Sequence, residues 1–297
     1  MYDVMAFYAF ASWPAFETHR PALKGLCSDN SLTGSILLAP EGVNGTVAGS
    51  PHGLEALLDY LHALPEFSEL TPRYSTAQDP PFRKMKVRLK KEIVTLGIDG
   101  IDVSNTATHV APADWDRLIS DPDVVLVDTR NDYEIAIGSF PGAINPHTNS
   151  FGDFPAWAAE NLKPTDTVAM FCTGGIRCEK ATAYLKQQGF DDVYQLQGGI
   201  LKYLKEIPAQ DTNWQGECYV FDERVSVRPG LVPGRYKVCV NCNSALGREE
   251  LTAPGYERGV TCPTCVDSIS PERRARFAER QRQIELAEAR GEHHLGP

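Results

Sequence analysis

A cysteine at the end of an apolar run, followed by two glycines and an arginine, is the strongest chemical signal in the sequence. The run Val168-Ala-Met-Phe171 is typical of a buried strand and leads directly into Cys172. Thr173, Gly174, Gly175 and Ile176 form a loop before a helix expected over 179–188. Backbone N–H groups that turn inward, together with the start of a helix, would form an anion cradle and lower the thiol pKa. We therefore predict that Cys172 is a nucleophilic thiolate.

Two residues that follow this loop are candidate supporting groups. Arg177 lies five residues after Cys172, where it can close the cradle or anchor the loop. Cys178 falls in the first helical turn and is interpreted as a packing or supporting residue. The alternative for Cys178 is a resolving thiol that forms a disulfide with Cys172. The alternative for the whole loop is a buried, inert Cys172.

Polar residues and glycines also follow two other apolar runs. Val124-Val-Leu-Val127 ends in Asp128, and Val193-Tyr-Gln-Leu196 ends in Gln197-Gly-Gly199. Strands that alternate with helices predict a parallel sheet, whose active site lies beyond the carboxyl ends of the strands. Asp128 and Arg130 are predicted to orient and neutralise one another and the loop, and Glu134 to pair with a nearby arginine.

Four of the eight cysteines form two closely spaced pairs near the C-terminus. Cys239 and Cys242 form one CxxC pair, Cys262 and Cys265 the other, and 19 residues separate the pairs. Such spacing presents four thiolates to one tetrahedral ion and predicts a structural zinc site. Reduced cysteines or redox-active disulfides are the alternative.

The net charge of −10 hides a basic segment. Residues 73–91 contain seven Lys and Arg against one acidic residue, whereas the residues on either side are strongly acidic. Apolar residues alternate with basic ones here, which predicts a strand with one buried and one cationic face. A solvated strand face and a phosphate-binding surface are both compatible with this pattern. The candidate RNA-binding residues are Arg83, Lys84, Lys86, Arg88, Lys90 and Lys91.

The elements around these motifs predict an α/β protein with three domains. Residues 1–95 read as strand–helix–strand–strand–helix–strand, a split-βαβ (ferredoxin- or acylphosphatase-like) domain that could bind RNA. Residues 108–210 form the parallel-sheet domain with Cys172. Residues 212–297 form a small four-cysteine module and a terminal helix, which Ser270 and Pro271 begin.

Composition excludes several classes of protein. Hydrophobic residues make up 42% of the chain and charged residues 23%, so wholesale disorder is excluded. No apolar run approaches the roughly 20 residues of a membrane-spanning helix. The first residues lack a basic segment and a continuous apolar stretch, so we expect no secretory signal and no membrane association. We expect a cytoplasmic protein, in which cysteines bind metal or do chemistry more often than they form disulfides.

The loop Cys172-Thr-Gly-Gly-Ile-Arg177 resembles that of the rhodanese family. The segment from Val127 to Asn145 and the motif Gln197-Gly-Gly-Ile200 support the resemblance. It implies a rhodanese fold for the central domain and a cysteine that can carry a sulfane sulfur as a persulfide. Phosphatases have a similar cradle, but their arginine lies one position further from the cysteine, which argues against a phosphatase.

A closer resemblance extends over the whole chain. The strings Ala39-Pro-Glu-Gly-Val-Asn-Gly45, Cys172–Lys180 and Val220-Phe-Asp-Glu-Arg-Val225 are similar to those of bacterial tRNA uridine(34) hydroxylases of the TrhO type. The resemblance implies hydroxylation of the wobble uridine of tRNA to 5-hydroxyuridine, with molecular oxygen as co-substrate and Cys172 as the catalytic cysteine. It also implies tRNA as partner, bound near the anticodon. The electron donor and the oligomeric state do not follow from it.

Three functions remain open at this point. The first is the tRNA uridine hydroxylase, in which Cys172 is expected to attack C6 of uracil. The second is a rhodanese-type sulfurtransferase that forms a persulfide on Cys172. The third is a non-catalytic RNA-binding adaptor that depends on the basic segment and not on Cys172.

Overall fold

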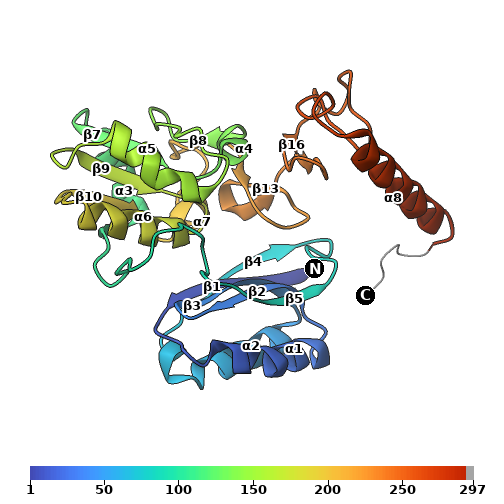
Figure 1. Cartoon of the computed structure of the whole chain (residues 1–297), viewed down its shortest axis with the longest axis horizontal. Helices are drawn as coiled ribbons and strands as arrows, with labels where there is room; N and C mark the ends of the chain where they lie inside the picture. Colours follow the sequence, from blue (N-terminus) through green and yellow to red (C-terminus); the bar gives the residue numbers. More distant parts are fainter. Residues whose placement is uncertain (292–297) are drawn as a thin grey trace.

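The computed structural model describes residues 1–291, and the last residues of the predicted 212–297 module, 292–297, lie outside the described residues. Figure 1 shows the N-terminal domain below the central domain, with the C-terminal module and its long helix to one side. The mixed α/β fold agrees with the expectation. Within the described residues, no helix is both long and apolar enough to cross a bilayer.

The N-terminal domain is a five-stranded sheet with two helices on one face. Its strands are β1 (Tyr2–Phe10), β2 (Thr33–Ala39), β3 (Gly42–Gly49), β4 (Arg73–Ala77) and β5 (Met85–Leu89), in the order β4-β1-β3-β2-β5. The helices are α1 (His19–Asp29) and α2 (Pro51–His62), with the 3-10 turns η1 (Phe16–Thr18) and η2 (Pro65–Phe67). This topology confirms the predicted split-βαβ domain.

The position of the basic strand differs from the expectation. The last strand of the split βαβ is β4, which pairs antiparallel with β1, whereas the basic strand β5 is an additional strand that pairs parallel with β2 at the opposite edge. The sequence pattern could not distinguish these places, because it sets which face of a strand is buried and not which strand lies beside it.

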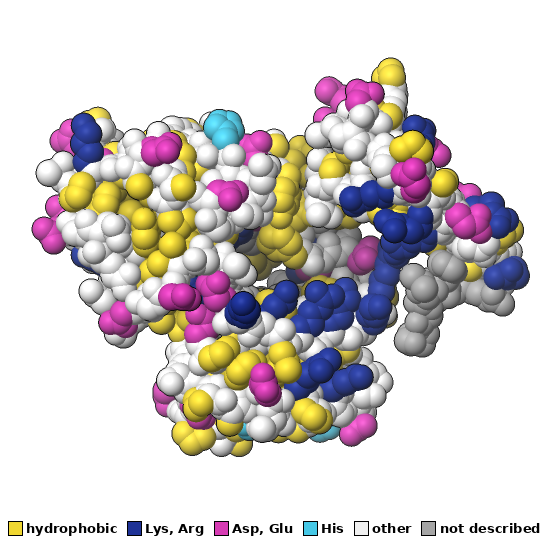
Figure 2. Space-filling view, in the orientation of Figure 1, with side chains coloured by type: hydrophobic (Ala, Val, Ile, Leu, Met, Phe, Trp, Pro, Cys, Tyr) yellow, Lys and Arg dark blue, Asp and Glu magenta, His cyan; other side chains and the backbone are white. Residues whose placement is uncertain are grey.

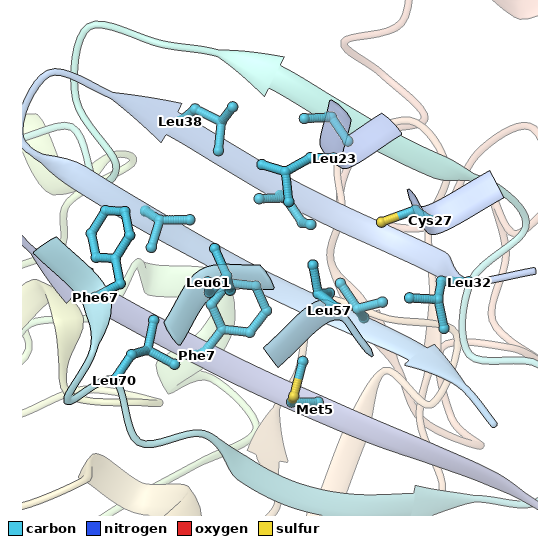
Figure 3. Packing of buried hydrophobic residues seen from close by; sticks show 14 of the residues in the cluster. Met5, Phe7, Leu23, Cys27, Leu32, Leu38, Leu57, Leu61, Phe67 and Leu70 are labelled. Carbon is cyan, nitrogen blue, oxygen red and sulfur yellow. The ribbon is translucent and has the colours of Figure 1, made fainter. Parts of the chain in front are cut away.

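One face of this sheet holds the domain's core. Met5 and Phe7 point toward the helices and pack with Leu57 and Leu61 (Figure 3), and Val87 of β5 belongs to the same buried cluster. Cys27 lies in the same core, fully buried, in agreement with a structural role. Side chains alternate across a strand. The opposite face of the sheet therefore carries Tyr8, Arg73 and the Lys and Arg side chains of β5.

The central domain contains a four-stranded sheet in which all neighbouring strands are parallel. Its strands are β6 (Thr108–Val110), β7 (Val124–Asp128), β9 (Thr167–Phe171) and β10 (Val193–Leu196), in the order β6-β10-β9-β7. Its helices are α3 (Pro112–Ile119), α4 (Asp132–Ile135), α5 (Phe154–Asn161), α6 (Ile176–Gln187) and α7 (Gly199–Glu206), with η3 (Phe151–Asp153) before α5. The predicted parallel sheet is confirmed.

The segment after α7 packs on the central domain. The strand β11 (Gln215–Gly216) pairs with β8 (Gly138–Ser139). The strands β12 (Cys218–Tyr219), β13 (Ser226–Arg228) and β14 (Val232–Pro233) follow, with η4 (Pro229–Leu231) between the last two. Trp214, Cys218 and Val227 share a core with the central domain's Phe171. We therefore propose that the C-terminal module begins near residue 234 and not at 212.

The C-terminal module is small. It contains β15 (Lys237–Val238), β16 (Ala245–Leu246) and α8 (Pro271–Ala289). The side chain of Ser270 accepts a hydrogen bond from the backbone N–H of Arg273 at 3.3 Å, which confirms the predicted helix cap. Of the residues of α8, only Ala287 is buried.

A buried lysine joins the N-terminal and central domains. Lys180, on α6, is 2% exposed, and its ammonium group lies 2.8 Å from Glu41 and 2.6 Å from Glu92. Glu41 belongs to the β2–β3 turn, and Glu92 lies in the segment that connects the domains. Because a buried charge is costly unless it is paired, these contacts fix the N-terminal domain against the helix that follows Cys172.

Candidate active site and metal centre

The Cys172 loop connects β9 to α6. The side chain of Cys172 is fully buried, and the backbone N–H of Gly175 donates a hydrogen bond to its sulfur at 3.1 Å. Gly175 has a φ of 96°, a left-handed conformation that glycine adopts without strain and that turns its N–H inward. The sequence prediction of a thiol inside a backbone cradle agrees with this geometry.

The glycines after β10 lead into α7, which contacts the backbone of the Cys172 loop. The first N–H groups of α7, from Ile200 and Leu201, donate to the carbonyls of Cys172 and Thr173, both at 3.0 Å. A Cβ on Gly199 would lie 2.5 Å from the Cys172 carbonyl oxygen, so this position requires glycine. The helix α7 thereby binds the carbonyl groups of the loop, so the N–H groups of the loop can point toward the Cys172 sulfur.

Arg177 anchors the loop to α4. Its guanidinium group forms two bonds to the carboxylate of Glu134, at 2.6 and 2.8 Å, and a third to the hydroxyl of Thr173 at 3.2 Å. Glu134 is fully buried. Burial alone would raise its pKa, but the Arg177 charge and hydrogen bonds outweigh burial and lower it. The predicted pairing of Glu134 with an arginine is confirmed.

Asp128 and Arg130 form a second buried pair further from the sulfur. Two bonds of 2.7 and 2.9 Å join them, and both side chains are fully buried. Arg130 also donates to the backbone carbonyl of Glu134 at 3.3 Å, and its guanidinium lies over the ring of Trp214. These contacts brace the end of β7 and α4, so this pair acts on the loop through Glu134.

The electrostatics of the loop favour a thiolate at Cys172. Burial would raise the pKa of this thiol, but a hydrogen bond from Cys178, the charge of Arg177 and backbone N–H groups outweigh burial and lower the pKa to about 6. Cys178 is also fully buried. Burial and the neighbouring Cys172 raise the Cys178 pKa well above its usual value. Cys178 therefore keeps its proton and stabilises the anion beside it.

Two residues of the N-terminal domain cover the loop, and the sequence reasoning missed their role. Arg73, on β4, donates to the carbonyls of Gly174 and Gly198, the second at 3.1 Å. The hydroxyl of Tyr8, on β1, donates to Glu179 at 3.1 Å and lies 2.9 Å from where a Cβ on Gly175 would be. No local pattern marks Tyr8, and Arg73 is one cation among the seven of the basic segment.

Tyr8 ends a polar chain that reaches the surface. Glu179 accepts from Tyr8 and lies 3.1 Å from His109, whose side chain is 40% exposed. Burial would raise the pKa of Glu179, but His109 and the other hydrogen bonds lower it. The hydrogen bond to Glu179 raises the pKa of His109. This chain gives the covered active site a polar route to solvent.

The predicted RNA-binding residues lie away from the helices of the N-terminal domain. Lys84, Lys86, Arg88 and Lys90 are exposed, and we call this set the cationic face. Lys86 and Arg88 pair in register with Ser35 and Leu37 of β2, on the sheet face that also carries Tyr8 and Arg73. Lys91 is exposed beside them. Arg83 differs, because its guanidinium binds Glu223 at 3.0 Å.

A hollow of about 840 Å³ lies between the N-terminal domain and the C-terminal module. Figure 2 shows Lys and Arg side chains gathered between these two parts of the molecule. Basic residues from both sides line the hollow, among them Arg83, Arg235, Lys237, Arg258 and Arg280.

The four C-terminal cysteines lie together, as their spacing predicted. All four sulfur atoms lie within 4.8 Å of one another. The pairs Cys239–Cys265 and Cys242–Cys262 are separated by 3.8 and 3.5 Å. A tetrahedral ion with metal–sulfur bonds of about 2.3 Å needs sulfurs about 3.8 Å apart. The cluster can therefore hold a metal ion with little movement.

The lowered pKa of Cys172 makes its reactivity testable. Above pH 6 the thiolate predominates, so alkylation by iodoacetamide should reach half its maximal rate near pH 6, whereas an ordinary thiol does so near about 8.5. Cys178→Ala should shift the midpoint of Cys172 upward, because the thiol that donates a hydrogen bond to its sulfur is removed. Peptide mass spectrometry at each pH measures Cys172 separately from the other cysteines. A midpoint at about 8.5 in the wild-type protein would contradict the cradle.

Two protein-family profiles match the chain. The UPF0176 acylphosphatase-like domain matches residues 2–93, and the rhodanese-like domain matches residues 111–206. Among solved structures, a rhodanese-related protein from Thermoplasma volcanium is 23% identical. The comparison covers 33% of this chain and 92% of that protein, with a TM-score of 0.29.

Proteins named tRNA uridine(34) hydroxylase are similar to nearly the whole chain. The one from Mesorhizobium japonicum is 53% identical over an alignment 297 positions long, which covers 99% of this chain and 96% of the relative. The one from Teredinibacter turnerae is 52% identical over an alignment 298 positions long, which covers 99% of this chain and 93% of the relative. The similarity thus includes the four-cysteine module, which lies outside both profiles. This chain belongs to the tRNA uridine(34) hydroxylase family.

Proposed function

We propose that this protein is a cytoplasmic enzyme that hydroxylates wobble uridine 34 of tRNA to 5-hydroxyuridine, with molecular oxygen as co-substrate. The observation that carries the proposal is a thiol with its pKa lowered to about 6, in a chain that is similar from end to end to the hydroxylases. A thiolate is the nucleophile that addition to a pyrimidine ring requires.

The proposed reaction begins when the Cys172 sulfur forms a bond to C6 of uracil. C5 then acquires enolate character and bonds to one atom of oxygen. A two-electron donor, with protons from solvent, then cleaves the O–O bond, which leaves a hydroxyl group on C5 and releases the other oxygen atom as water. The proton on C5 departs, and the Cys172–C6 bond breaks. The thiolate is regenerated, and one hydroxyl group remains on C5. Tyr8, Glu179 and His109 provide a route for the proton from the covered site to solvent.

Cys172, the loop Thr173–Ile176 and Arg177 have distinct parts in this proposal. The sulfur reacts, the loop N–H groups stabilise its charge, and Arg177 holds the loop through Glu134. Cys178 keeps a proton beside the thiolate. Asp128 and Arg130 support the backbone of Glu134 and do not touch the substrate.

A rhodanese-type sulfurtransferase is the second candidate. The match of the rhodanese-like profile to residues 111–206 favours it, because the loop lies within this match. Cys172 has no exposed surface beneath Arg73 and Tyr8, and this burial applies equally to both candidates, so their reaction products must distinguish them.

Replacement of Cys172 separates the candidate functions. We expect Cys172→Ser to abolish 5-hydroxyuridine in tRNA while tRNA binding is retained, because a hydroxyl at this position remains protonated and does not attack. The measurement is nucleoside mass spectrometry of tRNA from a deletion strain that expresses either form. If 5-hydroxyuridine persists with Cys172→Ser, the hydroxylase proposal is wrong. A persulfide on Cys172 after thiosulfate, with thiocyanate formed from cyanide, would instead support the sulfurtransferase.

We propose that the cationic face and Lys91 bind tRNA phosphates near the anticodon. Clustered Lys and Arg attract a polyanion locally even where the net charge is −10. Lys86 and Arg88 of this set share a sheet face with Tyr8 and Arg73, which contact the Cys172 loop and its closing glycines. RNA that lies along this face therefore leads toward the reacting cysteine. Arg83 is a weaker candidate, because Glu223 neutralises it.

The salt dependence of binding tests this surface. The triple variant Lys84→Ala, Lys86→Ala and Arg88→Ala should bind tRNA more weakly. It should also reduce the slope of log affinity against log salt concentration by about 2 to 3, because three phosphate contacts are lost. The control replaces three cations of the central domain, Arg117, Lys163 and Lys186, with alanine. Equal losses in the two triple variants would show that only net charge matters.

We propose zinc as the ion of the four-cysteine cluster. Thiolate ligands in a tetrahedron are typical of structural zinc. The core of the module consists mainly of these cysteines with Leu246, Leu251 and Tyr256, so little apolar surface is available to hold it without an ion.

Metal analysis and thermal unfolding test the zinc site. The purified full chain should contain a single zinc ion, and Cys242→Ser should lose it and unfold the module at a lower temperature. The neighbouring Val240→Ala, whose side chain is 41% exposed in the wild type, should keep zinc and the wild-type transition. A protein that holds no zinc while all four cysteines are reduced would contradict the assignment.

A further inference from the structure

The loop between β12 and β13 carries an aromatic side chain that is exposed to solvent. Phe221 is 63% exposed, more than the exposed aromatics Tyr2 and Tyr74 at 38% and 44%. An exposed phenylalanine forgoes the favourable free energy of burying its ring. Its neighbour Val220 and the following Val225 are both buried, so the surrounding chain has access to a core.

Strong local contacts keep this loop rigid. The backbone N–H of Val220 donates to the carbonyl of Val225, and that of Val225 donates to Asp222, both at 2.9 Å. Asp222 and Arg224 form an ion pair at 2.6 Å, with side chains 3% and 10% exposed. The ring of Tyr219 meets that of Phe221 edge to face at 5.3 Å. The Phe221 side chain is therefore held in its exposed position, and does not merely lie in a loose loop.

The loop is fixed to both groups of residues that surround the active site. On one side, Tyr219 packs against Tyr133 of α4, and the next residue, Glu134, binds Arg177 and Thr173 of the Cys172 loop. On the other side, Arg224 donates to the hydroxyl of Ser75 on β4 at 3.0 Å. Ser75 lies two residues after Arg73, which covers Gly174. The loop that carries Phe221 therefore lies where the central and N-terminal domains meet, beside the candidate active site.

Basic residues lie on the N-terminal side of this position. The carboxylate of Glu223 binds Arg83, which precedes the cationic face. The backbone N–H of Glu223 donates a hydrogen bond to the carbonyl of Pro81 at 2.9 Å. Aromatic side chains beside a cationic surface are the arrangement that proteins use to bind unpaired nucleotides, because every base offers a π face to stack.

We propose that Phe221 stacks on an unpaired base of the tRNA anticodon loop and holds the wobble uridine at the entrance to the Cys172 site. This inference rests on the proposed function for the identity of the RNA. Phe221 is then a substrate-contacting residue, whereas Arg224, Asp222 and Tyr219 are positioning residues that act through it.

Steady-state kinetics with an anticodon stem–loop RNA tests the contact. Phe221→Ala should lower kcat/KM by about 10- to 100-fold, the effect of removing one stacking partner. Phe221→Trp should restore it, whereas Phe221→Leu, which keeps the apolar surface without an aromatic face, should not. The control Leu286→Ala, at a site 43% exposed on α8, should match the wild type. The pH profile of Cys172 alkylation should be unchanged in all four variants, which shows that the active site is intact.

A binding measurement separates this inference from the hydroxylase proposal. The fluorescence of Phe221→Trp should be quenched when the stem–loop is added, in excess of any change in the wild type, and this needs no turnover. If Phe221→Ala has the wild-type kcat/KM and Phe221→Trp shows no additional quenching, the stacking role is wrong. If quenching occurs but wild-type enzyme forms no 5-hydroxyuridine, the hydroxylase proposal fails and the RNA contact stands.

Discussion

The buried thiolate of Cys172 is the interaction on which the rest of the site depends. A charge without exposed surface is unfavourable unless nearby dipoles and charges replace water. Backbone N–H groups at the start of α6, the Cys178 thiol and the Arg177 charge do so here. Arg177 is itself buried, and the carboxylate of Glu134 neutralises its charge. The backbone carbonyl of Glu134 accepts a hydrogen bond from Arg130, whose own buried charge is neutralised by Asp128. A series of buried ion pairs therefore extends from the sulfur to the end of β7.

The second constraint is the docking of the N-terminal domain on the catalytic helix. Lys180, Tyr8 and Arg73 connect the two domains through contacts with Glu41, Glu179 and the loop carbonyls. One face of the N-terminal sheet therefore carries both the contacts to the Cys172 loop and the cationic face. Under the proposed function, this arrangement gives a physical reason for two domains of different fold to be present in one chain, because RNA bound by the cationic face would lie beside the domain that carries Cys172.

Much of the site was predictable because it is local in sequence. Cys172, its loop and Arg177 lie within six consecutive residues, and their spacing identified the cradle. The two CxxC pairs likewise predicted the cluster whose sulfurs lie within 4.8 Å. The strand pattern identified the cationic face but not the edge of the sheet at which it lies. The basic strand β5 pairs with β2, whereas β4 pairs with β1 as the last strand of the split βαβ. Residues 214–233 were predicted to belong to the four-cysteine module. Their apolar side chains instead pack in the core of the central domain.

The sequence by itself determined the candidate cysteine, the parallel sheet that presents it and the four cysteines that lie together near the C-terminus, because each follows from residue types at short spacing. Only the tertiary structure decided that Tyr8 and Arg73 cover the loop, that Lys180 joins two domains and that Phe221 is displayed beside the active site. Tyr8 and Glu179 are 171 residues apart in the chain, and Arg73 and Gly174 are 101 apart. Such contacts arise from the packing of separately patterned elements against one another, and no local periodicity or motif encodes which faces will meet.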